Sequence, residues 1–253
     1  MALTNKTIAS TYGDILQADN SGSGRTANGT TIKDGLGNST ALTLGQNKLH
    51  VKPSSDQTDA VVIETSGGTD LLVVDSTNSA IKLGTSQSYA NTQYLRFSAN
   101  DIDVDSGTHI GVPVSGQTAN AVVTFGTSAN PAVPTQTVTA DDWIHYIHYV
   151  DTNISVDSVQ VLVGATAATG DSLNFHLCSL RTTDTTTVDA WSGITVVADD
   201  SGTTNAGYEQ FYKVGLTVQS ADVDAGDYLA LTIEGNGTNS DYSVNALVRY
   251  HLR

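Results

Sequence analysis

Apolar and polar residues alternate along much of this chain, which is the pattern of half-buried β-strands. Residues 42–51 and 95–104 share one spacing, apolar-x-apolar-x-x-Asn-x-apolar-x-apolar, and residues 72–83 form a looser copy with a longer turn. Each copy predicts two short strands around an Asn-bearing turn, which is a β-hairpin. Three short hairpins bury only one face in a single chain, so the pattern predicts that neighbouring copies of the chain share a core.

Longer and more apolar strands are expected in the second half of the chain. They lie near residues 143–150, 159–164, 172–180, 193–198, 211–218, 228–234 and 242–252, separated by clusters of Gly, Asp and Asn. This number of strands in so short a segment is typical of a two-sheet antiparallel sandwich or a jelly roll. The expected fold is therefore all-β, with a short β-hairpin repeat shaft followed by an antiparallel, jelly-roll-like β-sandwich.

Turn signals and prolines divide the chain into four expected parts. Residues 1–40 are polar and rich in turns, so this segment is expected to be ordered only against a partner. Residues 41–126 hold the repeats of the shaft. Residues 127–139 contain two of the four prolines and are predicted to be a linker. Residues 140–253 form the sandwich.

Composition and charge exclude several classes of protein. The 253 residues include 35 Thr and 25 Val but only 6 Lys and 3 Glu, which suits strands and excludes a helical bundle. A net charge of −15 argues against nucleic acid and against an anionic membrane surface as direct partners. No apolar run is long enough to insert into a membrane, and the first residues lack the apolar core of a secretion signal. Synthesis in a cytoplasm is therefore expected.

Three segments carry a resemblance to a known family. Residues 64–85 contain a Gly-rich turn, a strand, Asp-Ser-Thr-Asn and a strand ending in Gly-Thr, and this segment resembles the repeat unit of tailed-bacteriophage fibre proteins. The stretch from residue 10 to residue 37 resembles N-terminal segments of phage virion appendage proteins. Residues 223–231 are similar to the Gly-Asp turn and following strand of jelly-roll heads on trimeric fibres and spikes.

The resemblance implies a homotrimeric, non-enzymatic structural protein of a virion, made in the bacterial host cytoplasm and exposed on the particle surface. Residues 1–40 would dock on other virion proteins of the capsid, portal or tail, and the sandwich would be an outward tip. Recognition of a host surface glycan by this tip is a hypothesis. A capsid decoration protein and a polysaccharide-degrading tail spike are the two alternatives.

Two groups of carboxylates are candidate cation sites. Asp101, Asp103 and Asp105 alternate with apolar residues, which places them on one face of a strand. In a trimer this face could form rings of carboxylates that bind a cation, but a solvated outer face is the favoured interpretation. The same two alternatives hold for the turn acids Asp222, Asp224 and Asp227. No cofactor is expected beyond such a structural cation.

Histidines and the single cysteine are expected to pack rather than to react. His145 and His148 are three residues apart on an expected strand, so they lie on opposite faces, which argues against joint binding of one zinc ion. Asn174, His176 and Cys178 share a face of another strand, where neighbours two residues apart are separated by about 7 Å. That distance disfavours a nucleophilic Cys–His pair. Cys178 is expected to be a small buried hydrophobe, and no catalytic residue is predicted.

Aromatic residues are the candidates for a receptor site. Trp191 lies in a turn-rich region and could stack on a sugar ring. Tyr208 and Tyr242 are the other candidates for receptor contact. The alternative for Trp191, which the sequence favours, is a side chain that covers one end of the sandwich.

Overall fold

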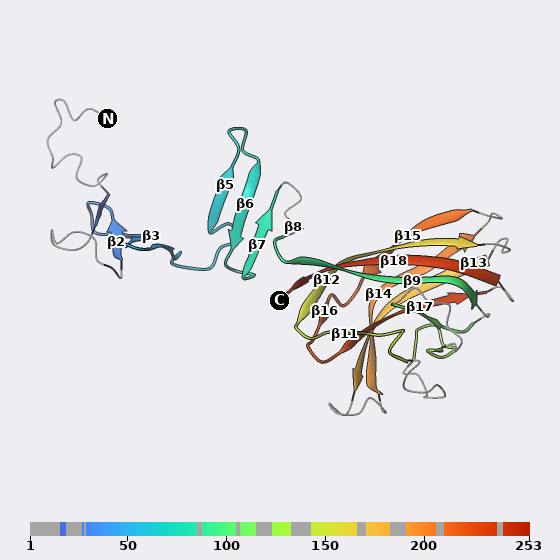
Figure 1. The fold of residues 1–253 in the computed structure, drawn as a ribbon. Coiled ribbons are helices and arrows are strands. Elements are labelled where there is room, and N and C mark those ends of the chain that lie inside the picture. The colour runs from blue at the N-terminus through green and yellow to red at the C-terminus, as the bar shows by residue number, and fades with distance from the viewer. Residues whose placement is uncertain are drawn as a thin grey trace. The chain divides into compact units, whose positions relative to one another are not determined.

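The computed structural model describes residues 16–18, 27, 29–84, 88–104, 107–114, 123–132, 143–165, 171–182, 191–205, 210–236 and 240–253. Antiparallel strands make up nearly all of the regular structure in these residues, which confirms the all-β fold class. The chain separates into two compact units, Met1–Ala90 and Asn91–Arg253 (Figure 1). Each hydrogen-bonded sheet lies within one of the two units.

The first sheet of the first unit contains the hairpin predicted for residues 42–51. Its strands, in the order in which they pair, are β1 (Gln17–Ala18), β2 (Thr30–Lys33), β3 (Ser39–Leu44) and β4 (Leu49–Val51). In the β3–β4 pair, Leu44 lies opposite Leu49 and Leu42 lies opposite Val51. This register confirms the predicted hairpin.

The second sheet of the first unit contains the looser repeat. Its strands, again in pairing order, are β5 (Val61–Glu64), β6 (Asp70–Asp75), β7 (Ala80–Leu83) and β8 (Ser88–Tyr89). Leu72 lies opposite Leu83 and Asp75 lies opposite Ala80, so the hairpin predicted for residues 72–83 is confirmed.

Asp75 organises the turn between β6 and β7. Its carboxylate accepts hydrogen bonds from the backbone N–H of Asn78 at 2.9 Å, from the Asn78 amide at 2.8 Å and from the Lys82 ammonium at 2.8 Å. These contacts, with Asn78 contributing most, lower the pKa of Asp75 to about 2. The Asp-Ser-Thr-Asn segment, residues 75–78, is therefore a turn in which one carboxylate satisfies three donors.

The third expected hairpin, at residues 95–104, was a wrong prediction. These residues belong to one long strand, β9 (Thr92–Val104), which pairs with β18 (Ser240–Leu252). The register shifts between Tyr242 and Val244, where β9 carries an extra residue, and Asp101 there has a left-handed φ of 62°. A β-bulge therefore changes the phase of the alternation, as a hairpin turn would, without reversing the chain.

The second unit is a sandwich of two antiparallel layers. Sheet I has the strand order β15 (Phe211–Val218), β12 (Ile154–Ala165), β18, β9. Sheet II has the order β14 (Trp191–Asn205), β13 (Asp171–Thr182), β17 (Tyr228–Gly235), with β10 (Ile110–Val112) and β11 (His148–Tyr149) both paired to β17. The short strand β16 (Asp222–Val223) pairs with β12, and two residue pairs between β14 and β15 join the sheets along one side.

This strand order is that of a jelly roll. When β11 and β16 are set aside, sheet I contains the first, eighth, third and sixth strands of the unit and sheet II contains the second, seventh, fourth and fifth. Alternate residues of both sheets point into the space between them and are almost fully buried. Among the largest buried side chains of this core are Phe97, Phe175, Leu177, Leu231 and Tyr242.

The sandwich begins earlier in the chain than predicted. Strands β9 and β10 were expected in the shaft of residues 41–126, but β9 is the edge of sheet I and β10 pairs with β17. The compact unit accordingly starts at Asn91 rather than at residue 140. Of the expected linker, residues 133–139 lie outside the described part, and Ala132 donates a backbone hydrogen bond to Phe125.

The strand predicted at residues 143–150 is present only as the short β11. Residues 143–146 form a turn, closed by the Tyr146 N–H donating to the Trp143 carbonyl at 2.9 Å. Both of these aromatic side chains are buried, at 3% exposure. Burial of two residues three positions apart suits a turn laid on a sheet, whereas a strand would place them on opposite faces.

Truncating Phe97 tests whether β9 belongs to the sandwich. Phe97 is fully buried in the core of the second unit, so Phe97→Ala should destabilise that unit by about 3–5 kcal/mol. The two tryptophans, Trp143 and Trp191, both lie in the second unit, so urea unfolding followed by tryptophan fluorescence reports on it alone. Gln93→Ala, an exposed change on the same strand, is the control. Equal midpoints for the two variants would contradict the placement of β9.

Candidate functional site

The outer face of sheet II is covered by the chain itself. Residues 123–125 and 143–147 lie on this face and make a second, smaller apolar cluster with it. The members of this cluster are Val123, Phe125, Trp143, Tyr146, Ile147, Leu180, Trp191, Ile194, Tyr228 and Ala230. Most of its aromatic rings gather near the end of the sandwich where β14 and β17 begin.

The aromatic rings of this cluster form a continuous series that reaches the surface. The ring centroids of Trp143 and Trp191 are 5.3 Å apart, those of Trp191 and Tyr228 are 5.6 Å apart, and those of Tyr228 and Tyr149 are 5.3 Å apart. Tyr149 ends the series and is 55% exposed. We call Trp143, Trp191, Tyr228 and Tyr149 the aromatic series.

The three predicted receptor residues differ in where they lie in the structure. Trp191 is half-buried within the aromatic series, and its indole N–H is buried without an acceptor in the described part of the chain. Tyr208 lies outside the described residues. Tyr242 is a correction, because it points into the core between the two sheets, where it is 1% exposed and out of reach of a surface ligand. Tyr149, which is more exposed than Trp191, was missed because its pairing with Tyr228 joins segments far apart in sequence.

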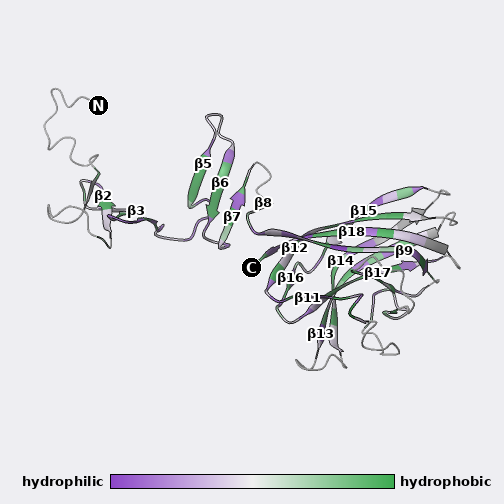
Figure 2. Cartoon of the chain, viewed as in Figure 1, coloured by the Kyte–Doolittle hydropathy of each residue, from purple (hydrophilic) through white to green (hydrophobic). Residues whose placement is uncertain are grey.

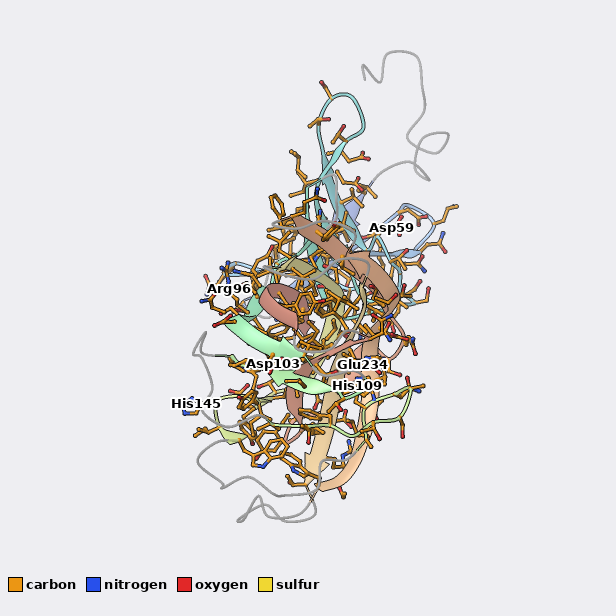
Figure 3. All side chains as sticks on the ribbon, turned by 90° about the vertical axis from the view of Figure 1, so that its right-hand side faces the viewer. Asp59, Arg96, Asp103, His109, His145 and Glu234 are labelled. Atoms are coloured by element: carbon orange, nitrogen blue, oxygen red, sulfur yellow. The ribbon has the colours of Figure 1, made fainter. Side chains whose placement is uncertain are left out.

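We call residues 123–125 and 143–147 the covering segment. A polar cluster is buried further along sheet II, next to residues 125–128. His109 and His176 meet edge to face, with ring centroids 4.9 Å apart. His109 Nε2 lies 2.7 Å from the Ser128 carbonyl oxygen and 3.6 Å from a Glu234 carboxylate oxygen (Figure 3). His176 Nε2 lies 3.3 Å from an Asp199 carboxylate oxygen. Neither Nδ1 atom has a hydrogen-bond partner among the residues that the structure describes.

Burial disfavours the charged forms of two side chains here, His176 and the neighbouring Cys178. Burial lowers the pKa of His176, the Asp199 carboxylate opposes that shift, and His109 adds to it. Burial also raises the pKa of the Cys178 thiol, with a smaller contribution from Asp199. Cys178 is fully buried, as the sequence predicted. The thiolate is therefore disfavoured, and the arrangement of Cys178 and His176 suits packing rather than nucleophilic attack.

Of the two histidines that the sequence singled out at residues 143–150, His145 lies on the covering segment and His148 lies next to it, on β11. His145 is exposed in the turn after Trp143, and His148 is half-buried on β11, opposite Leu229. Burial lowers the pKa of His148, and the nearby Asp151 opposes that shift. The expectation that the two histidines occupy opposite faces of one strand is wrong, because no strand joins them.

The two groups of candidate cation ligands differ in their surroundings. Asp101 and Asp103 are exposed on β9, and Asp105 lies outside the described residues. The turn acids, in contrast, meet arginines. Asp227 accepts from Arg181 Nε at 3.0 Å, and Arg253 donates to Asp222 at 2.8 Å and to Asp224 at 3.1 Å.

Arginine side chains thus supply the counter-charges in the turn between β16 and β17. Within the ranges that the structure describes, no three or more His, Cys, Asp and Glu side chains form a group that could hold a metal ion.

Comparisons with known proteins give no family assignment. No family model matches the chain, and no curated protein matches it. A solved structure, that of Eiger TNF from S. frugiperda, aligns with a TM-score of 0.30 and 11% sequence identity, covering 64% of this chain and 94% of that one. The described residues contain no helix that is long and apolar enough to cross a membrane.

The buried His176 should make the stability of the sandwich depend on pH. Its pKa is lower in the folded state, so the unfolded chain binds a proton more readily as the pH falls below about 6.5. Stability should therefore fall on acidification from pH 7 to pH 5, by at most about 1.4 kcal/mol per pH unit for this one proton. His176→Gln should lessen that slope, whereas the exposed His145→Gln should not. If the unfolding free energy of His176→Gln, measured with urea, depended on pH as steeply as that of the wild-type chain, the effect of burial on His176 would be contradicted.

Proposed function

We propose that this chain is a non-enzymatic structural protein of a bacteriophage particle. It forms a homotrimeric short fibre or spike that attaches through residues 1–40 and exposes the sandwich. The observation that carries this proposal is an uncovered apolar face on the second sheet of the first unit. The resemblance of residues 64–85 to phage fibre repeats supplies the biological setting.

The register of this sheet places six apolar side chains on one face. Val61 lies opposite Val74, which lies opposite Ile81, and Ile63 lies opposite Leu72, which lies opposite Leu83. All six residues are on the same face because side chains alternate along each strand. Figure 2 shows the green of hydrophobic residues along β5 and β6.

Much of this face is open to solvent in the single chain. Ile63 is 53% exposed, Ile81 is 48% exposed and Leu83 is 47% exposed. The first sheet has a similar surface, where Leu49 is 64% exposed. Sheets this small are stable only when an apolar face is packed against something, and large exposed apolar faces mark protein contacts. Copies of the same segment in a trimer would cover each other and provide the shared core of a shaft.

The sandwich has the features expected of an outward tip. It has its own core, and its aromatic series ends in the exposed ring of Tyr149. An exposed aromatic ring suits stacking on the apolar face of a sugar. Three tips on one trimer would bind a host surface glycan together, so that the overall avidity exceeds the weak affinity of each tip.

The shaft is tested by one substitution on the apolar face. Wild-type chain should have a solution mass of three times 26.4 kDa by light scattering. Ile63→Asp places a charge on the uncovered face and should shift the mass towards that of one chain. Val62→Asp, on the opposite face of the same edge strand and 38% exposed, is the matched control and should leave the trimer intact. A wild-type monomer at all concentrations would overturn the preassembled trimer.

Glycan binding is tested at the exposed end of the aromatic series. Tyr149→Ala should lower the binding of labelled protein to host cells several-fold, because it removes the accessible ring. Ile144→Ala is the control, since Ile144 is 69% exposed on the same covering segment but lies outside the aromatic series. Equal binding by the two variants would argue against recognition through this series.

A further inference from the structure

His109 connects residues 123–128 to sheet II. Its backbone carbonyl accepts a hydrogen bond from the Phe125 N–H at 2.8 Å, and its side chain reaches the Ser128 carbonyl oxygen through Nε2 at 2.7 Å. The same ring packs edge to face on His176, which belongs to β13 in the interior of sheet II. One histidine therefore contacts residues 123–128 with both its backbone and its side chain, and meets the sheet through a second histidine.

The contacts of the two rings determine where an added proton must go. A carbonyl oxygen only accepts hydrogen bonds, so the Nε2 atom of His109 carries a hydrogen. The Asp199 carboxylate, 3.3 Å from Nε2 of His176, favours the same tautomer there. The remaining basic nitrogen of each ring is Nδ1, and both Nδ1 atoms are buried without a hydrogen-bond partner in the described part of the chain. A proton added to either ring would therefore be a buried donor that lacks an acceptor.

A positive charge on either ring would also be poorly solvated. His109 is fully buried and His176 is 3% exposed, so water does not stabilise a charge on them. The ring centroids are 4.9 Å apart, so two charged rings would repel each other. The charged groups that act on His176 are His109 itself, Glu234 from β17, and Asp199 and Asp200 from β14. Glu234 and Asp199 attract a positive charge, but they lie beside the Nε2 atoms and leave Nδ1 without an acceptor.

The two histidines belong to parts of the sandwich that are held to different degrees. His176 lies on β13, which pairs with β14 along one edge and with β17 along the other. His109 precedes β10, a three-residue strand at the end of the sheet order. Residues 123–128 add to this edge through a single bridge, between Thr124 and Ile110, and a few backbone hydrogen bonds. Such segments open at a lower free energy than central strands, so separation of the rings moves residues 123–128 and not β13.

We propose that the pair of His109 and His176 is an acid-sensitive latch, which releases residues 123–128 from sheet II when the pH falls. In the closed form both Nδ1 atoms are buried, whereas in the open form water supplies the missing acceptor. The open form therefore binds a proton more readily, and a falling pH favours it. Phe175 and Leu177 flank His176 and face the core between the sheets, so the latch lies on the outer face and its opening leaves that core intact.

Opening of the latch changes the surface of sheet II. Phe125 is fully buried, and its ring meets that of Trp143 edge to face with centroids 5.8 Å apart. Release of residues 123–128 uncovers Phe125 and the side of Trp143 that it contacts. The second unit then presents an apolar surface in acid that it hides at neutral pH. This inference depends neither on the trimer nor on the glycan contact of the proposed function.

The test follows the accessibility of Trp143 in the full-length chain. Trp191→Phe leaves Trp143 as the only tryptophan, so quenching of its fluorescence by acrylamide reports on its contact with solvent. Between about pH 7 and about pH 5 we expect the quenching constant to rise several-fold, while the far-UV circular dichroism of the strands stays unchanged. Protection of Trp143 at both pH values would overturn the latch. A rise that coincides with loss of the circular dichroism signal would also overturn it, because the whole sandwich would then be unfolding.

Substitution of the two rings connects the opening to its cause. In the Trp191→Phe chain, the combination of His109→Gln and His176→Gln removes both titrating rings and should keep Trp143 protected at about pH 5. His145→Gln is the matched control, since His145 is exposed two residues from Trp143 and should leave the opening unchanged. Opening that persists in the chain with both glutamines would overturn the proposal.

The neighbouring carboxylates provide a test that leaves both rings in place. Asp199→Asn and Glu234→Gln preserve the size of each side chain and remove an attraction for a positive charge on the adjacent histidine. Each should shift the midpoint of the opening to lower pH, because the ring then binds its proton less readily. Asp103→Asn, an exposed change on the edge strand of sheet I, is the control and should leave the midpoint unchanged. A midpoint that neither carboxylate variant shifts would overturn the latch, even if the histidine variants fold poorly.

Discussion

Each sheet has two faces, and the sheets of this chain have more apolar faces than its described residues cover. In the second unit, sheets I and II cover each other's inner faces with an almost fully buried core. The aromatic and histidine clusters exist because the covering segment lies on the outer face of sheet II. The outer face of sheet I and the apolar face around Ile63 and Ile81 have no such cover in the described residues. The need to cover the apolar face around Ile63 and Ile81 leads to the proposal of a trimeric shaft.

The alternation of apolar and polar residues predicted a strand correctly where one face of the strand packs on the core. It failed where contacts with segments far away in the sequence determine the structure. The strand expected at residues 211–218 matches β15, since its inward residues alternate without interruption. Residues 95–104 copied the hairpin spacing of 42–51, but β18 supplies a continuous partner and converts the break into a bulge. Trp143 and Tyr146 looked like members of a strand because both alternating faces of residues 143–150 are mostly apolar or aromatic. Their packing on the outer face of sheet II explains why they form a turn instead.

The candidate sites show the same division between local and distant information. Burial of Cys178 followed from its apolar neighbours along β13. The meeting of His109 with His176 did not, because it joins a loop to a strand whose sequences contain no shared signal. Tyr242 was chosen as a surface aromatic, yet its alternation with Val244 and Ala246 places it in the core. The aromatic series likewise depends on pairing between β11 and β17, which no spacing in the sequence reveals.

The position of β18 between β9 and β12 has a consequence for synthesis. Residues 240–252 pair along one edge with residues 92–104, so the contact joins parts of the chain that are far apart in sequence. Such contacts slow folding, because the entropy of closing a long loop is lost before the contacts contribute stabilising free energy. Until β18 has left the ribosome, β9 and β12 have unpaired edges that can recruit other chains. A prematurely terminated product would therefore be prone to aggregation instead of forming a smaller stable domain.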